Sequence, residues 1–560
     1  MAVADKSRKT FRVVFIKPSH YDDDGYVIRW HRTVVPSNTL AVMYGLSRDL
    51  IERKVLGEDV DIVIDAYDET NTKIPVDKII RDIKNSDGGG FVGFTGVQTN
   101  QFPRTVDMAT RFRDAGIQVC VGGFHVSGCV ALLPTIPPDI QHALDIGVSL
   151  FIGEAEGKLD GVFKDAYAGK MQPMYNYLSD LPAIESAPPP FLPAEMLGNA
   201  IGSISSFDAG RGCPFLCSFC SIINVQGNKS RRRTADDIEA IVRANAAQGI
   251  TRFFITDDNF ARNRNWEEIF DRLIMLRMDE GINIRLTLQV DTMCHKIKNF
   301  IDKAAAAGVG RVFIGMESIN TDTLKATGKK QNRISEYRTM FQAWRKARII
   351  TCAGFIVGFP GDTPESVMRD VETIKRELPI DFLQQSFLTP LPGSMDHKAL
   401  YEKGEWMDQD MNKYDLNHIV SNHPTMSREV WETTYWKAWN SFYSEEHIET
   451  IFKRARADGM SVGKALFLML WFYSCIKYER LHPFEAGFFR HKSRHERRPE
   501  LPVESPLIFY PKRIWEVSAT VLKVSRLLYR WGVMRRRIHG DPNAVKYTDL
   551  SLTPVQDESR

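Results

Sequence analysis

The sequence lacks long hydrophobic runs and has almost no net charge, and each absence excludes a class of protein. No stretch reaches the roughly eighteen apolar residues that span a bilayer, and no apolar signal core follows the charges near residue 1. A net charge of +3 over 560 residues argues against nucleic acid as a partner. We therefore expect an intracellular, cytoplasmic protein that binds no nucleic acid.

Cysteine is also scarce, and it is unevenly placed. Three of the eight cysteines lie between residues 213 and 220, and the other five are scattered at Cys120, Cys129, Cys294, Cys352 and Cys475. Scattered cysteines fit a reducing compartment without disulfides. The length predicts roughly three to four domains, and the hydrophobic (43%) and charged (26%) contents are typical of globular ones.

The three clustered cysteines are the strongest chemical signal in the chain. Cys213, Cys217 and Cys220 have the spacing CxxxCxxC. A cubane iron–sulfur cluster held by three thiolates keeps one iron open, and a small molecule can bind there through an amine and a carboxylate. The alternative is a zinc knuckle or a set of buried free thiols. Zinc usually takes four ligands, and no fourth Cys or His lies within twenty residues of the loop.

This spacing, with the aromatic Phe219 directly before the last cysteine, resembles the radical S-adenosylmethionine (radical SAM) superfamily. The resemblance implies that Cys213, Cys217 and Cys220 hold a [4Fe-4S] cluster whose fourth iron binds the methionine end of S-adenosylmethionine (SAM). It also implies reductive cleavage of SAM to a 5′-deoxyadenosyl radical. An electron donor of the flavodoxin or ferredoxin type would supply the electron.

Residues 1–170 alternate short apolar runs with helical patterns. The expected strands are residues 11–16, 61–64, 91–96, 118–123 and 149–154. Such alternation predicts an α/β domain with a doubly wound, Rossmann-like (flavodoxin-like) parallel sheet, whose ligand crevice lies at the carboxyl ends of the strands.

Two groups of residues at those strand ends, Gly122-Gly123 with His125 and Gly153-Glu154, are similar to the cobalamin-binding domain that precedes many radical SAM domains. The resemblance implies cobalamin contacts at Gly122, Gly123, His125, Gly153 and Glu154. The glycines would let the backbone approach a flat macrocycle. The chain departs from the pattern because none of its thirteen histidines has Asp two positions before it, so the Asp-x-His-x-x-Gly motif is absent. The alternative is a retained domain that binds nothing or another ligand.

Residues 171–200 are rich in proline and are expected to form an extended linker. Residues 201–400 then contain six strand patterns separated by helical ones. This alternation predicts a partial (β/α)6 barrel, the radical SAM barrel of the resembled family, with its chemistry at the carboxyl ends of the strands.

Polar residues follow the barrel strands, and by the same resemblance they would bind SAM. Asp257 and Asp258 would accept hydrogen bonds from its ammonium group, and Glu317 and Ser318 would face the nucleoside. The predicted contacts are, in chain order, Asp257, Asp258, Gln289, Asp291, Glu317, Ser318 and Gly358. For each residue alone, the alternative is a helix cap or a turn.

Basic segments outside the loop have two interpretations each. Residues 229–234 form either a solvated face or a contact for an external anion.

Residues 401–560 carry no catalytic motif and are expected to form a mostly helical accessory region. Within it, residues 512–537 form a basic amphipathic helix that either lies on a membrane surface or packs on the catalytic domain. The polar tail after residue 541 is expected to be disordered.

Together these patterns predict a radical SAM enzyme with an N-terminal cobalamin-binding-type domain, resembling the methyltransferases of that class. The expected reaction is C-methylation of an unactivated carbon in a small-molecule substrate, and the aromatic C-terminal region favours a large apolar or lipid-like one. Within the enzyme class, the alternative is a cobalamin-dependent cyclase or rearrangement enzyme without methyl transfer. Outside it, the alternative is a non-enzymatic iron–sulfur or cobalamin-binding sensor. The sequence identifies neither the substrate nor the oligomeric state.

Overall fold

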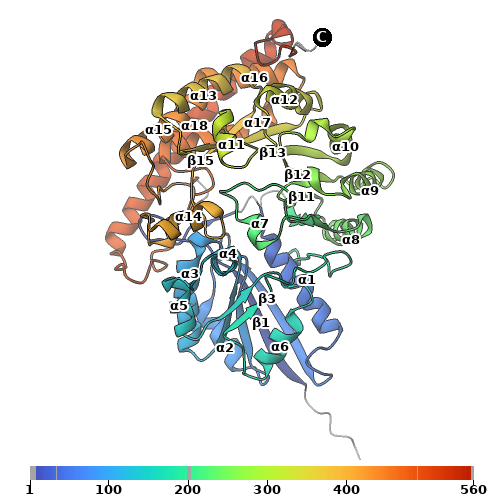
Figure 1. The fold of residues 1–560 in the computed structure, drawn as a ribbon, viewed down its shortest axis with the longest axis vertical. Helices are drawn as coiled ribbons and strands as arrows, with labels where there is room; N and C mark the ends of the chain where they lie inside the picture. Colours follow the sequence, from blue (N-terminus) through green and yellow to red (C-terminus); the bar gives the residue numbers. More distant parts are fainter. Residues whose placement is uncertain (1–7, 33–34, 198–203, 488–489, 556–560) are drawn as a thin grey trace, which may run out of the picture.

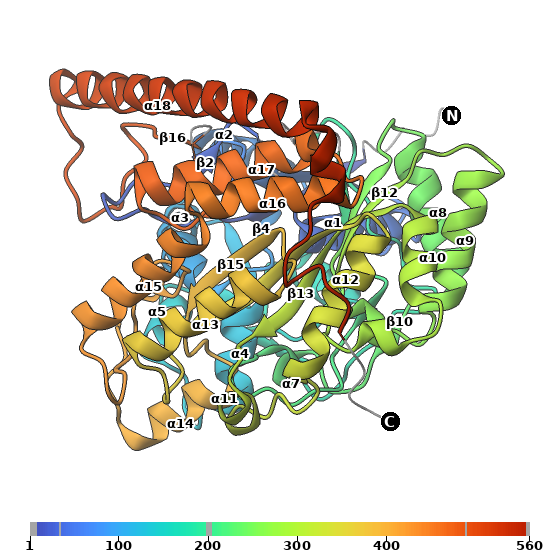
Figure 2. The same cartoon turned by 90° about the horizontal axis from the view of Figure 1, so that it is seen from above.

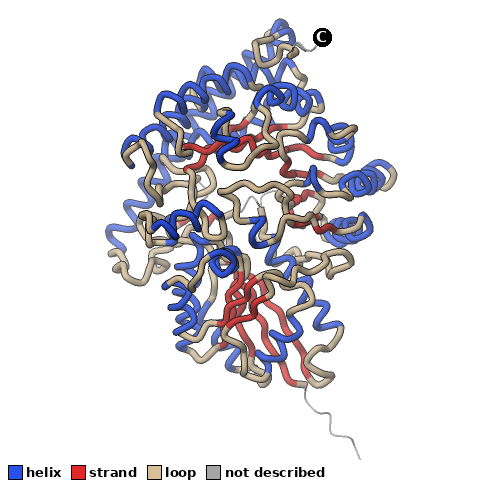
Figure 3. Tube along the Cα trace, in the orientation of Figure 1, coloured by secondary structure: helices blue, strands red, loops and turns tan. Residues whose placement is uncertain are grey.

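Two parallel β-sheets organise the molecule, and helices cover both of them. The computed structural model describes residues 8–32, 35–197, 204–487 and 490–555. In Figure 1 the first sheet lies below the second, and the C-terminal helices run along one side of the upper part. Figure 3 shows the two sheets as separate groups of strands. The predicted α/β class with a helical C-terminal region is confirmed.

The first sheet has six parallel strands in the order β3-β1-β4-β5-β6-β7. Its strands are β1 (Lys9–Lys17), β3 (Val60–Asp68), β4 (Gly90–Phe94), β5 (Gln118–Gly122), β6 (Ser149–Ile152) and β7 (Met174–Asn176). Alternate residues of β1 face opposite cores: Phe11 packs towards α1 (Asn38–Glu52) and α6 (Leu159–Tyr167), whereas Val14 packs towards α2 (Val76–Lys84) and α3 (Phe102–Asp114). The predicted doubly wound sheet is confirmed.

The first residues of the proline-rich segment form a strand of this sheet. Its residues Met174–Asn176 form β7, an edge strand that pairs in parallel with β6. The prolines follow, and the backbone N–H of Phe191 donates to the carbonyl of Ala41 in α1 at 3.0 Å. Three residues without apolar alternation are too few to predict a strand from sequence, so only the extended conformation was foreseeable.

The second sheet is a partial barrel with its strands in chain order. The strands are β8 (Ile204–Phe207), β11 (Arg252–Ile255), β12 (Arg285–Val290), β13 (Val309–Glu317), β14 (Ile350–Val357) and β15 (Phe382–Phe387). They are parallel. The connecting helices include α8 (Ala235–Ala246), α9 (Trp266–Met278), α10 (Phe300–Ala307), α12 (Tyr337–Lys346) and α13 (Pro364–Glu377). The predicted partial (β/α)6 barrel is confirmed.

The barrel stays open between its edge strands β8 and β15, and the first domain packs beside the β8 edge. The hydroxyl of Ser206 in β8 donates to the carbonyl of Pro36 at 2.8 Å, and the amide of Asn38 donates to Asp208 at 3.1 Å. Helix α1 packs against β8 as well. The carboxyl ends of the barrel strands therefore lie next to the first domain.

The C-terminal region packs its aromatic residues on the barrel. Trp431, Tyr435 and Trp439 of α15 (Arg428–Phe442) are buried. Helices α16 (Glu445–Ala457) and α17 (Val462–Ser474) lie beneath the long helix α18 (Pro506–Gly540), which forms one outer edge in Figure 2. Within the part of the chain that the structure describes, no helix is both long and apolar enough to cross a membrane.

The first and last parts of the chain are joined by a small sheet. Strand β2 (Arg29–Trp30) pairs antiparallel with β16 (Arg490–His491). Beside it, the Arg29 guanidinium binds the carboxylate of Glu496 at 2.8 and 2.9 Å. The loop after β1 is thus completed by residues from the far end of the sequence.

The expectation of a disordered tail is wrong for residues 541–555. Residues Pro542–Lys546 form a 3-10 helix, and Asp549 accepts a hydrogen bond from the buried Arg454 of α16 at 2.7 Å. The amide of Gln342 also donates to the carbonyl of Ser551 at 2.8 Å. A buried guanidinium needs a carboxylate partner, and this polar segment supplies it.

Candidate active site

The cysteine loop lies at the carboxyl end of β8 and is fastened at its base. Strands β9 (Gly210–Arg211) and β10 (Arg231–Arg232) pair antiparallel where the loop begins and ends. The carboxylate of Asp257 accepts hydrogen bonds from the backbone N–H groups of Ala209 at 2.7 Å and Gly210 at 2.8 Å. Gly212 has a φ of +85°, and a Cβ there would lie 2.6 Å from the carbonyl oxygen of Lys229. The backbone therefore enters the loop along one defined path.

The three cysteines fit a cluster better than a single ion. Among the described residues, the three sulfur atoms do not all lie within 4.8 Å of one another, as the donors of a single ion would. A cubane spreads its cysteine ligands more widely, because each sulfur binds a different iron. Burial raises the pKa of Cys220 to about 12 and also raises that of Cys213. These two thiols are thus protonated near neutral pH, and a bound metal cluster would stabilise their thiolates.

A second segment covers the loop from the barrel side. The backbone N–H of Ser218 donates to the carbonyl of Thr327 at 3.0 Å, and the amide of Gln331 lies 3.8 Å from the Cys217 sulfur. The Lys329 ammonium lies 5.7 Å from the centre of the Phe219 ring and 2.6 Å from the Glu317 carboxylate. Glu317, one of the predicted SAM contacts, is therefore in an ion pair.

The two adjacent aspartates have different surroundings. Asp257 holds the loop backbone, as described above. Asp258 lines the cavity beside the loop, and its carboxyl group interacts electrostatically with Cys213 and Cys220. Burial raises the pKa of Asp258 to about 6 and that of Asp257 to about 7. Of the pair, Asp258 is the carboxylate that an approaching ligand can meet.

Most of the other predicted SAM contacts already have partners within the protein. The carboxylate of Asp291 binds the Arg262 guanidinium at 2.6 and 2.9 Å and the Asn259 amide at 3.0 Å. The Gln289 amide donates to the Asp257 carbonyl at 3.3 Å. The Ser318 hydroxyl accepts from the backbone N–H of Asn320 at 3.0 Å.

Gly358 is needed for packing rather than for an open approach. Its φ is +110°, and a Cβ there would lie 2.0 Å from the indole ring of Trp431 in α15. The indole N–H also donates to the carbonyl of Val357 at 3.1 Å. Trp431 thus fills the space beside the Cα atom of Gly358. The assignment of Gly358 to SAM stays a prediction without a contact that favours it.

A cavity of about 340 Å³ lies between the two domains, next to the cysteine loop. The first domain lines it with Asn38, Thr39, Gln98 and Phe124, and the barrel lines it with residues that include Ser221 and Asp258. Ser221 directly follows Cys220. The cavity therefore touches the carboxyl ends of both sheets, where parallel folds bind ligands.

The five predicted cobalamin contacts lie near this cavity but do not line it. The ring of His125 is buried, with Nε2 2.8 Å from Asp139 and Nδ1 3.3 Å from Thr99. A Cβ on Gly123 would lie 2.2 Å from the Val97 nitrogen, and Cβ atoms on Gly122 and Gly153 would also meet protein atoms. The neighbouring Phe124 is the side chain at this strand end that lines the cavity, and the five cobalamin contacts stay predictions.

Glu154 belongs to an ionic cluster that joins the two domains. The Arg211 guanidinium binds Glu154 at 2.7 Å and Glu156 at 2.6 Å, and Arg231 binds Glu154 at 2.8 Å. These side chains are almost fully buried, and Arg211 lies two positions before Cys213. A buried ion-pair cluster at this point fixes the loop relative to the first domain.

Both interpretations of the basic run are wrong for its three arginines. Arg231 pairs with Glu154, Arg232 donates to the Asn265 side chain at 2.8 Å, and Arg233 is fully buried. Arg233 donates to the carbonyl of Asp208 at 3.1 Å. The arginines form neither a solvated face nor a contact for an external anion, because their partners come from other parts of the same chain. Lys229 is exposed.

Comparison with known proteins identifies the second domain. A family model described as the radical SAM superfamily matches residues 209–374. Bacteriochlorophyllide d C-12(1)-methyltransferase of Chlorobaculum tepidum is 28% identical over 322 residues, which are 55% of this chain and 65% of that protein. Hopanoid C-2 methylase of Rhodopseudomonas palustris is 24% identical over 56% of this chain and 58% of its own length. An anaerobic magnesium-protoporphyrin IX monomethyl ester cyclase of Cereibacter sphaeroides is 26% identical over 39% of this chain and 35% of its own length. The chain spans less than two thirds of each of these relatives.

Solved structures extend the likeness to both domains. TsrM, a radical SAM methyltransferase from Kitasatospora setae, superposes with a TM-score of 0.52 at 16% identity, over 70% of this chain and 76% of its own. OxsB, a cobalamin-dependent SAM radical enzyme, superposes with a TM-score of 0.52 at 13% identity, over 98% of this chain and 83% of its own. These low identities show a shared fold, and the resemblance drawn from the cysteine spacing is confirmed.

Proposed function

Since residues 209–374 form a radical SAM domain, we propose that the chain is a cobalamin-dependent methyltransferase acting on an unactivated carbon of a small molecule. The observation that carries this proposal is the cavity at the domain boundary, where the cysteine loop faces the carboxyl end of a flavodoxin-like sheet. Two relatives named as methyltransferases or methylases match more than half of the chain and support it further.

The residues at the cavity suit these groups. Cys213, Cys217 and Cys220 would hold the cluster, and Asp258 would accept hydrogen bonds from the ammonium of SAM. When bound, the cluster and SAM supply a 5′-deoxyadenosyl radical, and cobalamin supplies the methyl group. Phe124 offers a flat apolar wall. The described residues that line the cavity include no histidine, so a bound cobalamin would take no imidazole from this wall, in keeping with the missing Asp-x-His-x-x-Gly motif.

The test begins with anaerobic reconstitution with iron, sulfide and cobalamin, followed by dithionite and SAM carrying a deuterated methyl group. We expect 5′-deoxyadenosine and deuterated methylcobalamin, both measured by mass spectrometry. Cys220→Ala should abolish the 5′-deoxyadenosine, whereas the control Cys129→Ala, a buried cysteine of the first domain, should retain it.

The outcomes separate this proposal from its alternatives. Deoxyadenosine without methylcobalamin would favour a cyclase or rearrangement enzyme, the activity that the cyclase relative makes the second candidate. A stable cluster and bound cobalamin with no cleavage of SAM, even with candidate lipids added, would favour a sensor. Either result would overturn methyl transfer.

We also propose that a small protein of the flavodoxin or ferredoxin type reduces the cluster at the exposed tip of the loop. Leu216, adjacent to Cys217, is 63% exposed and offers an apolar contact there. Leu216→Glu should slow reduction by flavodoxin several-fold and leave reduction by dithionite unchanged. Equal slowing with both reductants would contradict this route.

Helix α18 supports a further proposal, peripheral contact with an anionic membrane. One face packs on α16 and α17 through Leu527, Trp531 and Ile538. The opposite face is apolar and open to solvent. It carries two series with seven-residue spacing, each side chain between 48% and 86% exposed: Leu507, Ile514, Val521 and Leu528, and beside them Ile508, Trp515, Leu522 and Tyr529.

The charge of α18 favours lipid over a second copy of the chain. Lysine and arginine occur eight times between residues 506 and 540, and Glu516 is the only acidic residue there. Two such helices would repel each other, and two adjacent apolar series are wider than the seam of a coiled coil. A basic helix with a broad apolar face matches an anionic bilayer surface. Such contact would suit a large apolar substrate.

Vesicle flotation tests this contact. The chain should float with phosphatidylcholine vesicles containing about a third phosphatidylglycerol and much less with phosphatidylcholine alone. Trp515→Glu with Leu522→Glu should abolish flotation, whereas Met278→Glu, an exposed residue of α9, should not. Absence of flotation, with a dimer in sedimentation that the double variant disrupts, would assign the face to a second copy.

A further inference from the structure

Three metal-ligating side chains meet far from one another in the sequence. His20 follows β1, Asp415 follows the short helix Met411–Lys413, and Glu485 follows the π-helix Cys475–Glu479. One ligand atom of each lies within 4.8 Å of the other two, and all three residues are less than 9% exposed. Among the described residues, no other group of three meets this condition.

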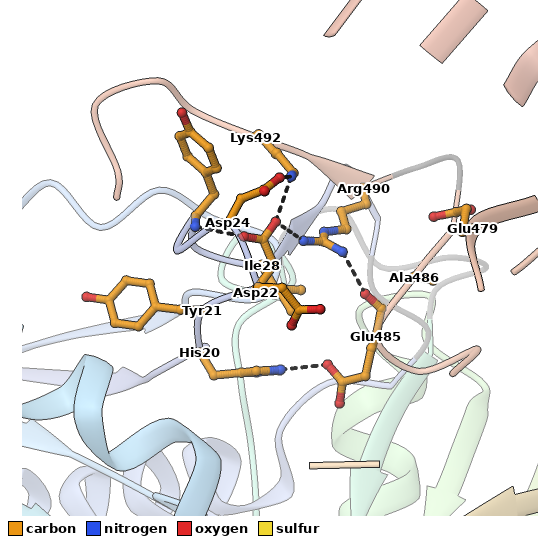
Figure 4. A network of polar contacts seen from close by, with 12 residues as sticks. His20, Tyr21, Asp22, Asp24, Ile28, Glu479, Glu485, Ala486, Arg490 and Lys492 are labelled. Atoms are coloured by element: carbon orange, nitrogen blue, oxygen red, sulfur yellow. Dashed lines mark hydrogen bonds and ion pairs between the residues drawn. The ribbon is translucent and has the colours of Figure 1, made fainter. Parts of the chain in front are cut away.

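The donor set is chemically suited to a divalent ion. Figure 4 shows the His20 ring and the Glu485 carboxylate pointing at each other, with Nε2 2.6 Å from Oε2. Donors around one ion, bound at about 2.1 Å, lie about 3 to 4.2 Å apart, so small side-chain shifts suffice. One imidazole with two carboxylates is a set that first-row metals such as Mn²⁺, Fe²⁺ and Zn²⁺ accept.

The local charge also favours a cation. Asp415 is held by His418 at 3.0 Å, and the other nitrogen of His418 lies 3.2 Å from Asp23. His20 and Glu485 complete this group, which therefore holds three carboxylates and two imidazoles. Asp415 and Glu485 are both buried, and a divalent ion bound with them by His20 would compensate the two carboxylates at once.

Neighbouring cations are already in use. Arg490 and Lys492, both beside the group in Figure 4, bind the carboxylate of Asp22. The Arg490 guanidinium also donates to the backbone carbonyl of Glu485 at 3.2 Å, which orients that residue without neutralising its side chain. The neighbouring basic side chains thus brace the site and leave its two carboxylates available.

We propose that His20, Asp415 and Glu485 bind one divalent first-row metal ion. The ion is separate from the cluster proposed above, because none of the three residues lines the cavity at the cysteine loop. It would join the loop after β1, the segment after the barrel and the C-terminal segment. Its role is structural, since a metal bound only by the folded chain stabilises the fold.

Mn²⁺ is the probe of choice, because it prefers oxygen and nitrogen donors to thiolates. The measurement uses the full chain carrying Cys213→Ala, Cys217→Ala and Cys220→Ala, which lacks the three thiols proposed to bind the iron of the cluster. After treatment with a chelator, this chain should bind one Mn²⁺, counted by the loss of the free-ion EPR signal. Mn²⁺ should also raise its melting temperature.

Two variants separate a metal site from an ion pair. Glu485→Gln removes a ligand, and His20→Gln keeps a hydrogen-bond donor for Glu485 but is a poor ligand. Each should weaken Mn²⁺ binding by roughly 100-fold or more and cancel the thermal shift. The control Glu496→Gln, a carboxylate of the same C-terminal segment that pairs with Arg29, should bind Mn²⁺ as the parent does.

The proposal is overturned if the parent chain binds no Mn²⁺ beyond background. It is also overturned if both variants retain the full stoichiometry and thermal shift, since the three residues would then be only an ion-pair network. Neither result bears on SAM cleavage, which is measured with the cysteines intact.

Discussion

The two parallel sheets meet at one cavity, but they contribute different kinds of side chain to it. At the barrel edge, the half-buried Asp258 lies near Cys213 and Cys220. At the first-sheet edge, His125 turns inward to Asp139, and Phe124 and Gln98 face the cavity. The barrel thus supplies thiols and a carboxyl group, whereas the first domain supplies a neutral wall. Substitutions that change charge should therefore affect the site most on its barrel side. Substitutions that change shape should affect it most on the side of the first sheet.

The largest expected effect comes from the barrel side of this comparison. Cys217→Ala removes a ligand that no neighbouring cysteine can replace, so the chain should lose its cluster absorbance and all production of 5′-deoxyadenosine. The control Cys120→Ala, in β5 of the first sheet, should keep both. Iron content and anaerobic absorbance measure the difference, and equal losses in the two variants would break the comparison.

Next in size is the ionic cluster that holds the two sides together. Arg211→Ala leaves Glu154, Glu156 and Asp208 without their shared partner in a buried site. A single unpaired buried charge typically costs about 3 to 5 kcal/mol, so denaturant unfolding should show a loss of that order. The surface control Arg243→Ala should change the stability far less, because its ion pairs are exposed to solvent. A loss that small in Arg211→Ala would mean that the domains do not depend on this cluster.

Asp258 offers a smaller effect with a defined pH dependence. Because burial raises its pKa to about 6, the charged form destabilises the fold, and this cost appears as pH rises from about 4 to 6. Asp258→Asn should therefore stabilise the cluster-free chain by up to about 3 kcal/mol at pH 8 and hardly at all at pH 4. The same variant should weaken SAM binding about tenfold or more in equilibrium dialysis. Stabilisation without weaker SAM binding would remove Asp258 from the site.

The smallest effect compares two neighbours in the first domain. Phe124→Ala should lower cobalamin retention about tenfold and change stability little, because Phe124 faces the cavity. His125→Ala should instead cost about 1 to 3 kcal/mol through loss of its bond to Asp139, with cobalamin retained. Absorbance of bound cobalamin after gel filtration separates the two. The opposite result would return the ligand role to His125.

The sequence was most informative where the signal is local. The predicted strands 11–16 and 61–64 lie within β1 and β3, and the cysteine spacing indicated the family without any structure. It was least informative where partners are distant. Glu154 and Arg211 are 57 positions apart, and Gly358 meets a tryptophan 73 positions later. A pattern of strands predicts at which edge of a sheet ligands bind. The direction in which each side chain points depends on its contacts with the other domain.

The small sheet between β2 and β16 has a consequence for how the protein is made. Residues 29–30 of the first domain must wait for residues 490–491 before they can pair. At a synthesis rate of roughly 5 to 20 residues per second, that wait lasts roughly 20 to 90 seconds. During this interval residues 29–30 have no partner strand, although the strands of the first sheet have already been synthesised. The ribosome thus produces an unfinished first domain, and only the synthesis of the last eighth of the chain completes it.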